Sequence, residues 1–236
     1  MVRKLIQNLK IKYNIFFGKI YKLKINKKQN HKWLGNEYGG FFVAHEFVNK
    51  DSIIYSFGVG EDITFDEGLI SEFGCQVFAF DPTPKSIKWV NGRTNPEEFK
   101  FAPFGIDKVT GKVNFLLPKN DAYVSGSAIN QMNVDEQKTV EVNMKTLADI
   151  ATELGHKKIE ILKMDIEGSE YSILDSILNA PVNIHQICVE IHERFFEDGK
   201  KKTEDLILKL KKYGYELFAI SKSYEELSFI KIDIKK

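Results

Sequence analysis

The sequence has few cysteines and no long uncharged apolar run, and both absences restrict the class of protein. Its 236 residues include only Cys75 and Cys188, which lie far apart in apolar segments without a CxxC or metal-ligand spacing. This predicts buried, reduced thiols in a cytoplasmic protein. No apolar run is long enough to cross a bilayer, and no small-residue cleavage site follows an apolar core. Neither a membrane span nor a secretory signal is therefore expected.

The first 32 residues lack acidic side chains altogether. They contain ten Lys and Arg residues, whereas residues 33–236 contain 24 Lys and Arg and 33 Asp and Glu. The formal net charge of +1 is therefore the sum of a basic head and a body with a net charge of −9. Apolar residues recur in the head at helical spacing, at Leu5, Leu9, Tyr13, Phe16, Ile20 and Leu23. Residues 1–32 are therefore predicted to form a basic amphipathic helical extension.

Such a helix has two interpretations. It either packs its apolar stripe on its own domain or makes a peripheral contact with an acidic partner or an anionic membrane, such as the inner membrane surface. Residues 33–236 contain most of a sequence that is 43% hydrophobic, enough for one substantial core, and are predicted to form a single domain. The acidic charge of this domain argues against a nucleic-acid partner.

The domain is organised around a strand that ends at two glycines. Residues 53–57 form a short apolar run, Gly58 and Gly60 follow, and a helix-like pattern resumes at Ile63. Glycine permits a tight turn and leaves room for a ligand beside the backbone. The pattern predicts a cofactor loop, although a plain strand-to-helix turn has the same form.

A second apolar strand, residues 76–81, ends in Asp81 about 20 residues after the loop, the spacing at which a carboxylate meets ribose hydroxyls. The third glycine of a dinucleotide fingerprint is missing, because Ile63 occupies its position. Glu61 and Asp62 would also repel phosphates at the helix start. These features favour a nucleoside without a pyrophosphate. S-adenosylmethionine fits, because it offers a ribose to Asp81 and positively charged groups to nearby acids.

Strands and helices alternate from residue 53 to residue 220, which predicts a doubly wound, Rossmann-like α/β sheet, mostly parallel, with its ligand at the carboxyl ends of the strands. Residues 215–220 and 227–232 are expected to close it as an antiparallel C-terminal hairpin. A third strand is predicted over 98–106, where Gly105 and Ile106 would pack against an adenine. Residues 120–131 are predicted to form a mobile loop near the ligand. Further strands are expected at 108–117, 139–144, 159–164 and 186–193, and helices at 146–154, 172–178 and 203–212.

The remaining candidate residues also follow apolar strands, in pairs two residues apart. These pairs are Asp165 with Glu167, and Glu190 with His192. Residues two apart in an extended segment share a face, so each pair can point into one cavity. A carboxylate at the mouth of an apolar strand is costly unless it is used. Glu170, in contrast, is interpreted as a charge at a helix start, where the helix dipole favours it.

Four segments together resemble the FkbM family of S-adenosylmethionine-dependent methyltransferases: residues 56–62 with Phe65 and Asp66, residues 80–84, 162–171 and 189–192. The resemblance spans residues 38–232. It implies a class I methyltransferase fold and O-methylation, typically of sugar or natural-product hydroxyls. It also implies that Gly58 and Gly60 hold the methionine part of the cofactor, that Asp81 binds the ribose, and that Asp165 lies beside the transferred methyl group.

The resulting hypothesis is methyl transfer from S-adenosylmethionine to a hydroxyl of a sugar, glycan or related small molecule, as in polysaccharide biosynthesis. The protein must align the acceptor and remove its proton, with His192 or Asp165 as base and Glu167 and Glu190 orienting the substrate. A divalent cation such as magnesium, bound by some of these oxygens, is an alternative. The predicted cofactor site comprises Ser56, Gly58, Gly60, Glu61, Asp62, Asp81, Pro82, Thr83, Gly105, Ile106 and Asp165.

Two other functions stay open. A nicotinamide-dependent oxidoreductase is opposed by the missing third glycine and by the acids of the loop. A non-catalytic module that binds S-adenosylmethionine and is tethered by its basic head is opposed by the cluster of acids and histidine between residues 165 and 192.

Overall fold

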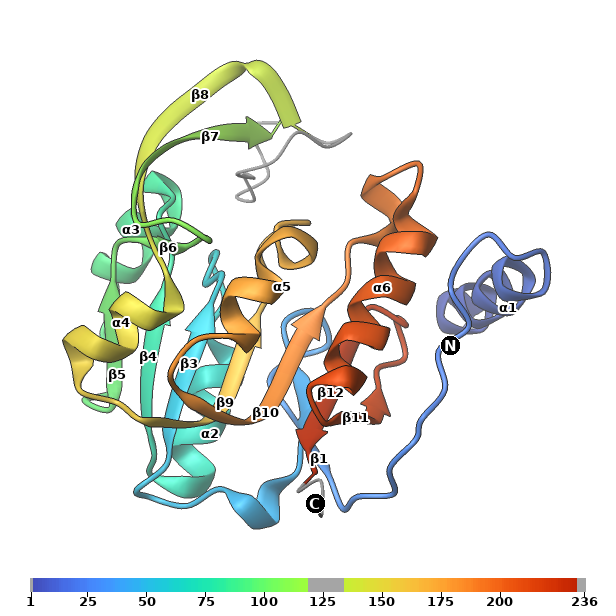
Figure 1. Ribbon diagram of the computed structural model, residues 1–236, viewed down its shortest axis with the longest axis horizontal. Helices are drawn as coiled ribbons and strands as arrows, with labels where there is room; N and C mark the ends of the chain where they lie inside the picture. Colours follow the sequence, from blue (N-terminus) through green and yellow to red (C-terminus); the bar gives the residue numbers. More distant parts are fainter. Residues whose placement is uncertain (1, 119–133, 233–236) are drawn as a thin grey trace.

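The computed structural model describes residues 2–118 and 134–232, and its centre is a seven-stranded sheet (Figure 1). The strand order is β11-β12-β10-β9-β3-β4-β5. All neighbouring pairs are parallel except those of β12, which is antiparallel to both β10 and β11. The predicted mostly parallel α/β sheet with an antiparallel C-terminal hairpin is confirmed. The strands are β3 (Ile53–Phe57), β4 (Gln76–Phe80), β5 (Phe99–Ala102), β9 (Lys158–Met164), β10 (Asn183–Glu190), β11 (Tyr215–Ile220) and β12 (Glu226–Lys231).

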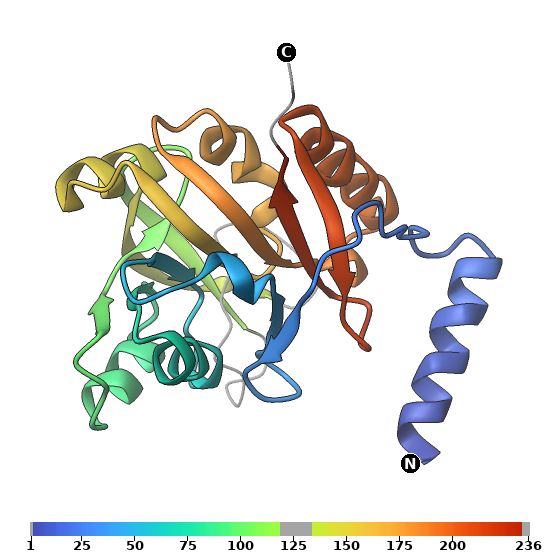
Figure 2. The ribbon, with the colours of Figure 1, turned by 90° about the horizontal axis from the view of Figure 1, so that it is seen from below.

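Both faces of the sheet are covered, which explains why apolar residues on its central strands are buried on both sides. One face packs against α4 (Leu147–Leu154), α5 (Glu170–Leu178) and α6 (Gly199–Lys212). The other packs against α2 (Thr64–Phe73), α3 (Pro84–Asn91) and the small β1 (Lys32–Leu34) and β2 (Phe41–Val43) ribbon, which the short helix η1 (His45–Phe47) follows. Figure 2 shows these two layers on either side of the sheet.

The chain order reverses between β3 and β9. From β3 the chain builds outward through β4 and β5, and it later returns to place β9 and β10 on the other side of β3. In a doubly wound sheet this reversal opens a crevice at the carboxyl ends of the two central strands. The loops that follow β3 and β9 therefore meet there.

The predicted third strand is wrong in one respect, because residues 98–106 form two strands in different sheets. β5 ends at Ala102, and β6 (Gly105–Ile106) pairs with β8 (Val134–Lys145) instead. Pro103 stands at the break, where its missing N–H prevents the ladder from continuing. β6, β8 and β7 (Gly111–Pro118) form a three-stranded sheet that rises above the central one (Figure 1). The loop predicted at 120–131 lies outside the described residues.

The amphipathic helix of the head is shorter than predicted. α1 (Val2–Phe16) ends before Gly18, whose φ is +65°, and residues 20–31 form no helix. This segment follows the body, where the backbone N–H groups of Asn26 and Lys27 donate to the Leu217 carbonyl at 2.9 and 3.2 Å. Leu23 consequently lies in the core. Among the described helices, none combines the length and apolar character needed to cross a membrane.

Candidate active site

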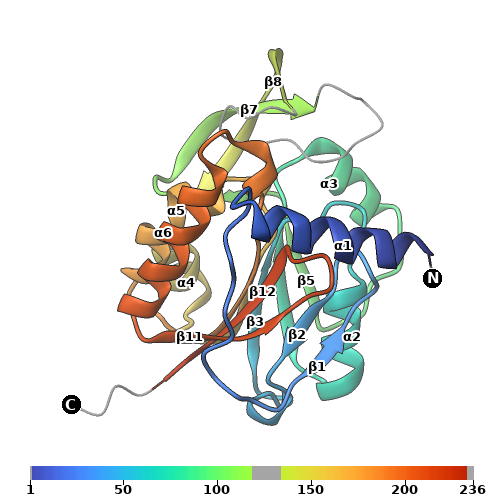
Figure 3. The same ribbon diagram turned by 90° about the vertical axis from the view of Figure 1, so that its right-hand side faces the viewer.

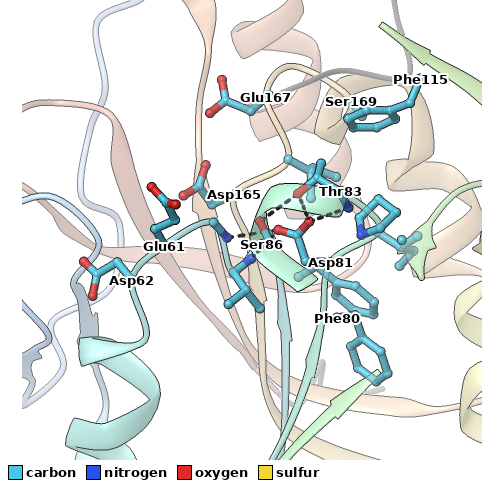
Figure 4. A pocket seen from close by; sticks show the side chains of 18 of the residues that line it. Glu61, Asp62, Phe80, Asp81, Thr83, Ser86, Phe115, Asp165, Glu167 and Ser169 are labelled. Atoms are coloured by element: carbon cyan, nitrogen blue, oxygen red, sulfur yellow. Dashed lines mark hydrogen bonds between the residues drawn. The ribbon is translucent and has the colours of Figure 1, made fainter. Parts of the chain in front are cut away.

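A cavity lies at the carboxyl ends of β3, β4 and β9, beneath the sheet of β6, β7 and β8. Most of the predicted site residues line it: Gly58, Gly60, Glu61, Asp62, Asp81, Pro82, Thr83, Gly105, Ile106, Asp165 and Glu167. Three do not, namely Ser56, Glu190 and His192. Figure 4 shows the acids Glu61, Asp62, Asp165 and Glu167 on one side of the view and the rings of Phe80 and Phe115 on the other.

The two loop glycines are needed for different reasons. Gly58 has φ of +81°, and a Cβ built on it would lie 1.7 Å from the backbone oxygen of Asp165. Only glycine lets the loops after β3 and β9 approach this closely. Gly60 has φ of +57°, but a Cβ there would meet no heavy atom within 4 Å. Gly60 therefore leaves open space at the cavity wall.

Asp81 fixes the glycine loop through hydrogen bonds. Its Oδ2 accepts hydrogen bonds from the backbone N–H groups of Val59 and Gly60, both at 2.9 Å. Its Oδ1 accepts from the Thr83 N–H at 2.9 Å and the Thr83 hydroxyl at 2.6 Å. A carboxylate offers about four acceptor positions, so a ribose hydroxyl would have to displace or share one of these bonds. Binding of the ribose by Asp81 stays a prediction.

His192 lies behind the cavity wall and is held by Glu170. Both side chains are buried, with 1% and 0% of their surface exposed. Glu170 Oε1 lies 3.0 Å from His192 Nδ1 and accepts the His192 N–H at 3.2 Å, while its Oε2 accepts the Gly168 N–H at 2.9 Å. Glu170 does stand in the first turn of α5, as predicted, but it also orients the histidine. Its position on one helical face with Ile173, Leu174 and Ile177 was the available sequence signal for burial.

The other ring nitrogen of His192 faces three carboxylates. Its Nε2 lies 3.5 Å from Glu190, 3.6 Å from Glu167 and 3.8 Å from Asp165. Burial alone lowers the pKa of His192, but the charge and hydrogen bond of Glu170, with the charges of Glu167 and Glu190, raise it to about 10. Burial and the charge of Asp165 raise the pKa of Glu190 to about 9. The neighbouring carboxylates thus favour the cationic form of His192, and burial disfavours the charged form of Glu190.

His192 misses the cavity because the chain bends where the prediction kept it extended, whereas Glu190 lies at the end of β10 and faces His192. β10 ends at Glu190, and His192 has φ of −105° and ψ of 44° before the short helix η2 (Glu193–Phe195). The rule that residues two apart share a face applies only within a strand. Ser56 misses it for another reason. It is fully buried in β3 and lies on the same side as Ile54, which packs toward α2.

Lys163 is a functional candidate that the sequence analysis did not single out. It is buried in β9, donates a hydrogen bond at 2.5 Å from Nζ to the Gly58 carbonyl, and lies 3.8 Å from Asp165 Oδ2. It therefore connects the glycine loop with the acid that follows β9. A lysine inside an apolar strand is costly without such partners, and this cost was the signal in the sequence. Further lining residues without an assigned role are Ser86, Phe115, Met144 and Ser169.

The cavity suits a positively charged nucleoside better than a pyrophosphate. Five acids line it, and none of the described lining residues is Lys or Arg. Ile106, Phe115 and Met144 offer an apolar surface for a base. The open position beside Gly60 leaves space along the backbone. These features match the sulfonium, amino group and adenine of S-adenosylmethionine.

Comparison with known proteins identifies a family. A family model described as the methyltransferase FkbM domain matches residues 53–217. "Probable methyltransferase-like protein 24" of Homo sapiens is 27% identical over 203 residues, which cover 83% of this chain and 49% of the relative. The Rattus norvegicus protein of that name is also 27% identical, over 206 residues, with the same coverage. The chain spans about half the length of these curated relatives.

Solved structures with some similarity include a fibrillarin pre-rRNA processing protein of Methanococcus jannaschii. It is 13% identical with a TM-score of 0.47, and the match covers 78% of this chain and 67% of that one. An rRNA methylase from Streptococcus thermophilus is 10% identical with a TM-score of 0.44, covering 80% and 95%.

The fold and the site thus define a class I S-adenosylmethionine-dependent methyltransferase. Within that class, the chain belongs to the FkbM methyltransferase family, whose domain model covers most of its length. This assignment opposes the alternative of a nicotinamide-dependent oxidoreductase.

Proposed function

We propose that this methyltransferase transfers a methyl group to a hydroxyl of a sugar, glycan or related small molecule. The observation that carries the proposal is the position of Asp165. Its side chain is 25% exposed at the cavity wall, its backbone touches Gly58, and its carboxylate lies between two cations, Lys163 and His192. An anionic oxygen is thereby fixed beside the predicted cofactor loop, where an acceptor proton must leave.

S-adenosylmethionine, when bound, supplies a methyl group on a sulfonium. Gly58 and Gly60 would hold its methionine part, and the apolar residues at the far end of the cavity would hold its adenine. The protein's part is to orient the acceptor oxygen toward the methyl group and to remove its proton.

Of the two predicted bases, we favour Asp165 over His192. His192 is buried and holds its proton at neutral pH, so it is suited to keep Asp165 in place rather than to accept a second proton. A base must also come within hydrogen-bond reach of the acceptor. Asp165 lines the cavity, whereas His192 lies behind it.

Glu167 supports the choice of a hydroxyl-bearing acceptor. Its φ of 54° lies in the left-handed region, which is uncommon for residues other than glycine and is concentrated at functional sites. This backbone conformation presents Glu167 at the cavity, next to Ser169. Two polar groups there can accept hydrogen bonds from neighbouring hydroxyls, as a sugar would require.

A divalent cation is a second element of the proposal. Three potential ligand atoms, one each from Asp165, Glu190 and His192, lie within 4.8 Å of one another. Glu170 contacts Nδ1 of His192, so the other ring nitrogen, Nε2, faces the carboxylates. Metal-binding histidines are typically oriented by such a carboxylate. Magnesium prefers oxygen ligands, so a set that includes an imidazole nitrogen suits a transition metal such as manganese better. To hold the ion, His192 and Glu190 would each have to release a proton, and the charge of the ion would then favour loss of a hydroxyl proton.

The first test is calorimetric titration of the chain with S-adenosylmethionine, S-adenosylhomocysteine and NAD, followed by assays of labelled methyl transfer to sugar acceptors with and without manganese or magnesium. Asp165→Asn is expected to keep cofactor binding and to lower turnover about 100-fold or more. Glu204→Gln, an exposed change on α6, is the matched control. Cofactor binding without transfer to any hydroxyl would favour the non-catalytic module, and selective binding of NAD would overturn the proposal.

A further inference from the structure

The first helix exposes a row of large apolar side chains. On α1 and directly after it, five of them are more than half exposed: Ile6 59%, Leu9 57%, Tyr13 52%, Phe16 84% and Phe17 57%. The rings of Phe17 and Tyr13 lie 4.4 Å apart and those of Phe17 and Phe16 5.2 Å apart, so the aromatic part of this surface is continuous. Contiguous apolar surface of this kind marks an interaction site rather than ordinary surface. We call these five residues the α1 apolar face.

The α1 apolar face has the pattern of a helix that lies in a membrane interface. At about 100° per residue its five members occupy a sector about 100° wide. Lys10 and Lys12 lie just outside the two edges of this sector, and both are exposed. No acidic residue occurs among residues 1–32, which contain ten Lys and Arg. An apolar strip bordered by lysines suits acyl chains below and anionic headgroups beside it.

The helix is attached to the body while its apolar face stays exposed. The Gly18 carbonyl accepts a hydrogen bond from Lys200 Nζ at 3.0 Å, and the Tyr21 N–H donates to Glu193 at 2.9 Å. The Leu23 N–H donates to the Tyr224 hydroxyl at 2.7 Å. Figures 2 and 3 show α1 beside the body instead of within its helical layers. Because Glu193 directly follows His192, this attachment lies at the carboxyl edge of β10, near the candidate site.

We propose that the α1 apolar face docks on the surface of a lipid bilayer that contains anionic lipids. The aromatic and aliphatic side chains would enter the interface, and the lysines of the head would contact the headgroups. A nucleic acid fits this face less well, because its phosphates would meet apolar side chains where lysines are needed. The inference is independent of the proposed methyl acceptor and is tested without any measurement of activity.

The test is co-sedimentation of the full chain with vesicles of phosphatidylcholine alone or mixed with phosphatidylglycerol, at low and high sodium chloride. The chain is expected to bind the mixed vesicles and to be released by salt. The double variant Leu9→Ser, Phe16→Ser is expected to lower the partition coefficient about tenfold or more, because two apolar side chains no longer insert. Lys10→Glu with Lys12→Glu is expected to weaken binding to the anionic vesicles only.

Matched controls come from α6, where Leu208→Ser removes another exposed apolar side chain and Lys211→Glu with Lys212→Glu reverses two exposed charges. These variants should bind as the parent does, and circular dichroism checks that every variant is folded. Absence of vesicle binding, or equal effects of the α1 and α6 variants, would overturn the proposal. So would a dimer in sedimentation velocity that is lost in Leu9→Ser, Phe16→Ser while vesicles are not bound, since a second copy would then cover the face.

Discussion

Asp66 allows the sharpest test of how the site is built. It lies in the first turn of α2 with 3% of its surface exposed. Burial raises its pKa from the ordinary value of 3.8 to about 6, and the charge of Lys163 limits the rise. Replacement of Asp66 by Asn keeps the shape of the side chain but removes the charge. The variant is therefore expected to be more stable than the parent at neutral pH.

The magnitude follows from the pKa. One pKa unit corresponds to about 1.4 kcal/mol, so the difference between 3.8 and about 6 means that ionising Asp66 costs the folded state about 3 kcal/mol. Between pH 4 and pH 6 the folded chain holds this proton more tightly than the unfolded chain. The contribution of Asp66 to stability is therefore intact below about pH 4, falls as the pH rises to about 6, and stays low above that.

The assay is urea unfolding of the parent and of Asp66→Asn at several pH values from 4 to 8. The free energy of unfolding of the variant minus that of the parent is expected to rise by about 2.5 kcal/mol across this range, because groups that do not interact with Asp66 contribute equally to both proteins. Asp51→Asn, at an exposed position, should give a constant difference. A difference for Asp66→Asn that stays constant or falls as the pH rises would refute the reasoning.

Three further predictions concern the site and the core. Gly58→Ala is expected to lower the melting temperature severely, because its Cβ would lie 1.7 Å from a backbone oxygen. Gly60→Ala should cost only about 1 kcal/mol of backbone strain. Equal melting temperatures of the two variants would contradict this. Glu170→Gln is expected to lower the pKa of His192 from about 10, which NMR titration of the imidazole measures, and an unchanged pKa would show that Glu170 does not hold the proton. Both cysteines are buried, and burial raises their thiol pKa to about 11 and 12, so iodoacetamide should modify them only after unfolding.

Much of the sheet and of the cavity lining could be predicted because the signals are local. Each central strand is an apolar run that stops at glycine, proline or an acid, as at Gly58, Asp81 and Asp165. In a parallel sheet the carboxyl ends of strands meet at one edge, so residues just after these strands gather in one place. The positions of the strand ends alone therefore identify most of the lining residues.

The wrong predictions concern residues whose positions are set by long-range packing. Leu23 has the spacing of a helical stripe, but it leaves the helix and enters the core, since the segment around it bonds to distant residues such as Leu217. Ser56 follows the strand alternation to the covered side of a sheet that is buried on both faces. His192 lies after a backbone bend for which the neighbouring residues give no sequence signal. None of these outcomes is encoded within a few residues of the position concerned.

The buried charges of the family motifs share one task, which is to hold backbone groups of the loops. Lys163 binds the Gly58 carbonyl, Asp81 binds two N–H groups of the same loop, and Glu170 binds the Gly168 N–H together with His192. Buried charges are costly unless paired, so these residues fix the shape of the loops at the cost of stability. The cavity lining also includes residues outside the motifs. Of these, Tyr38, in the turn between β1 and β2, and Phe115, in β7, belong to segments separate from the central sheet, which leaves them free to vary between relatives without disturbing the loops.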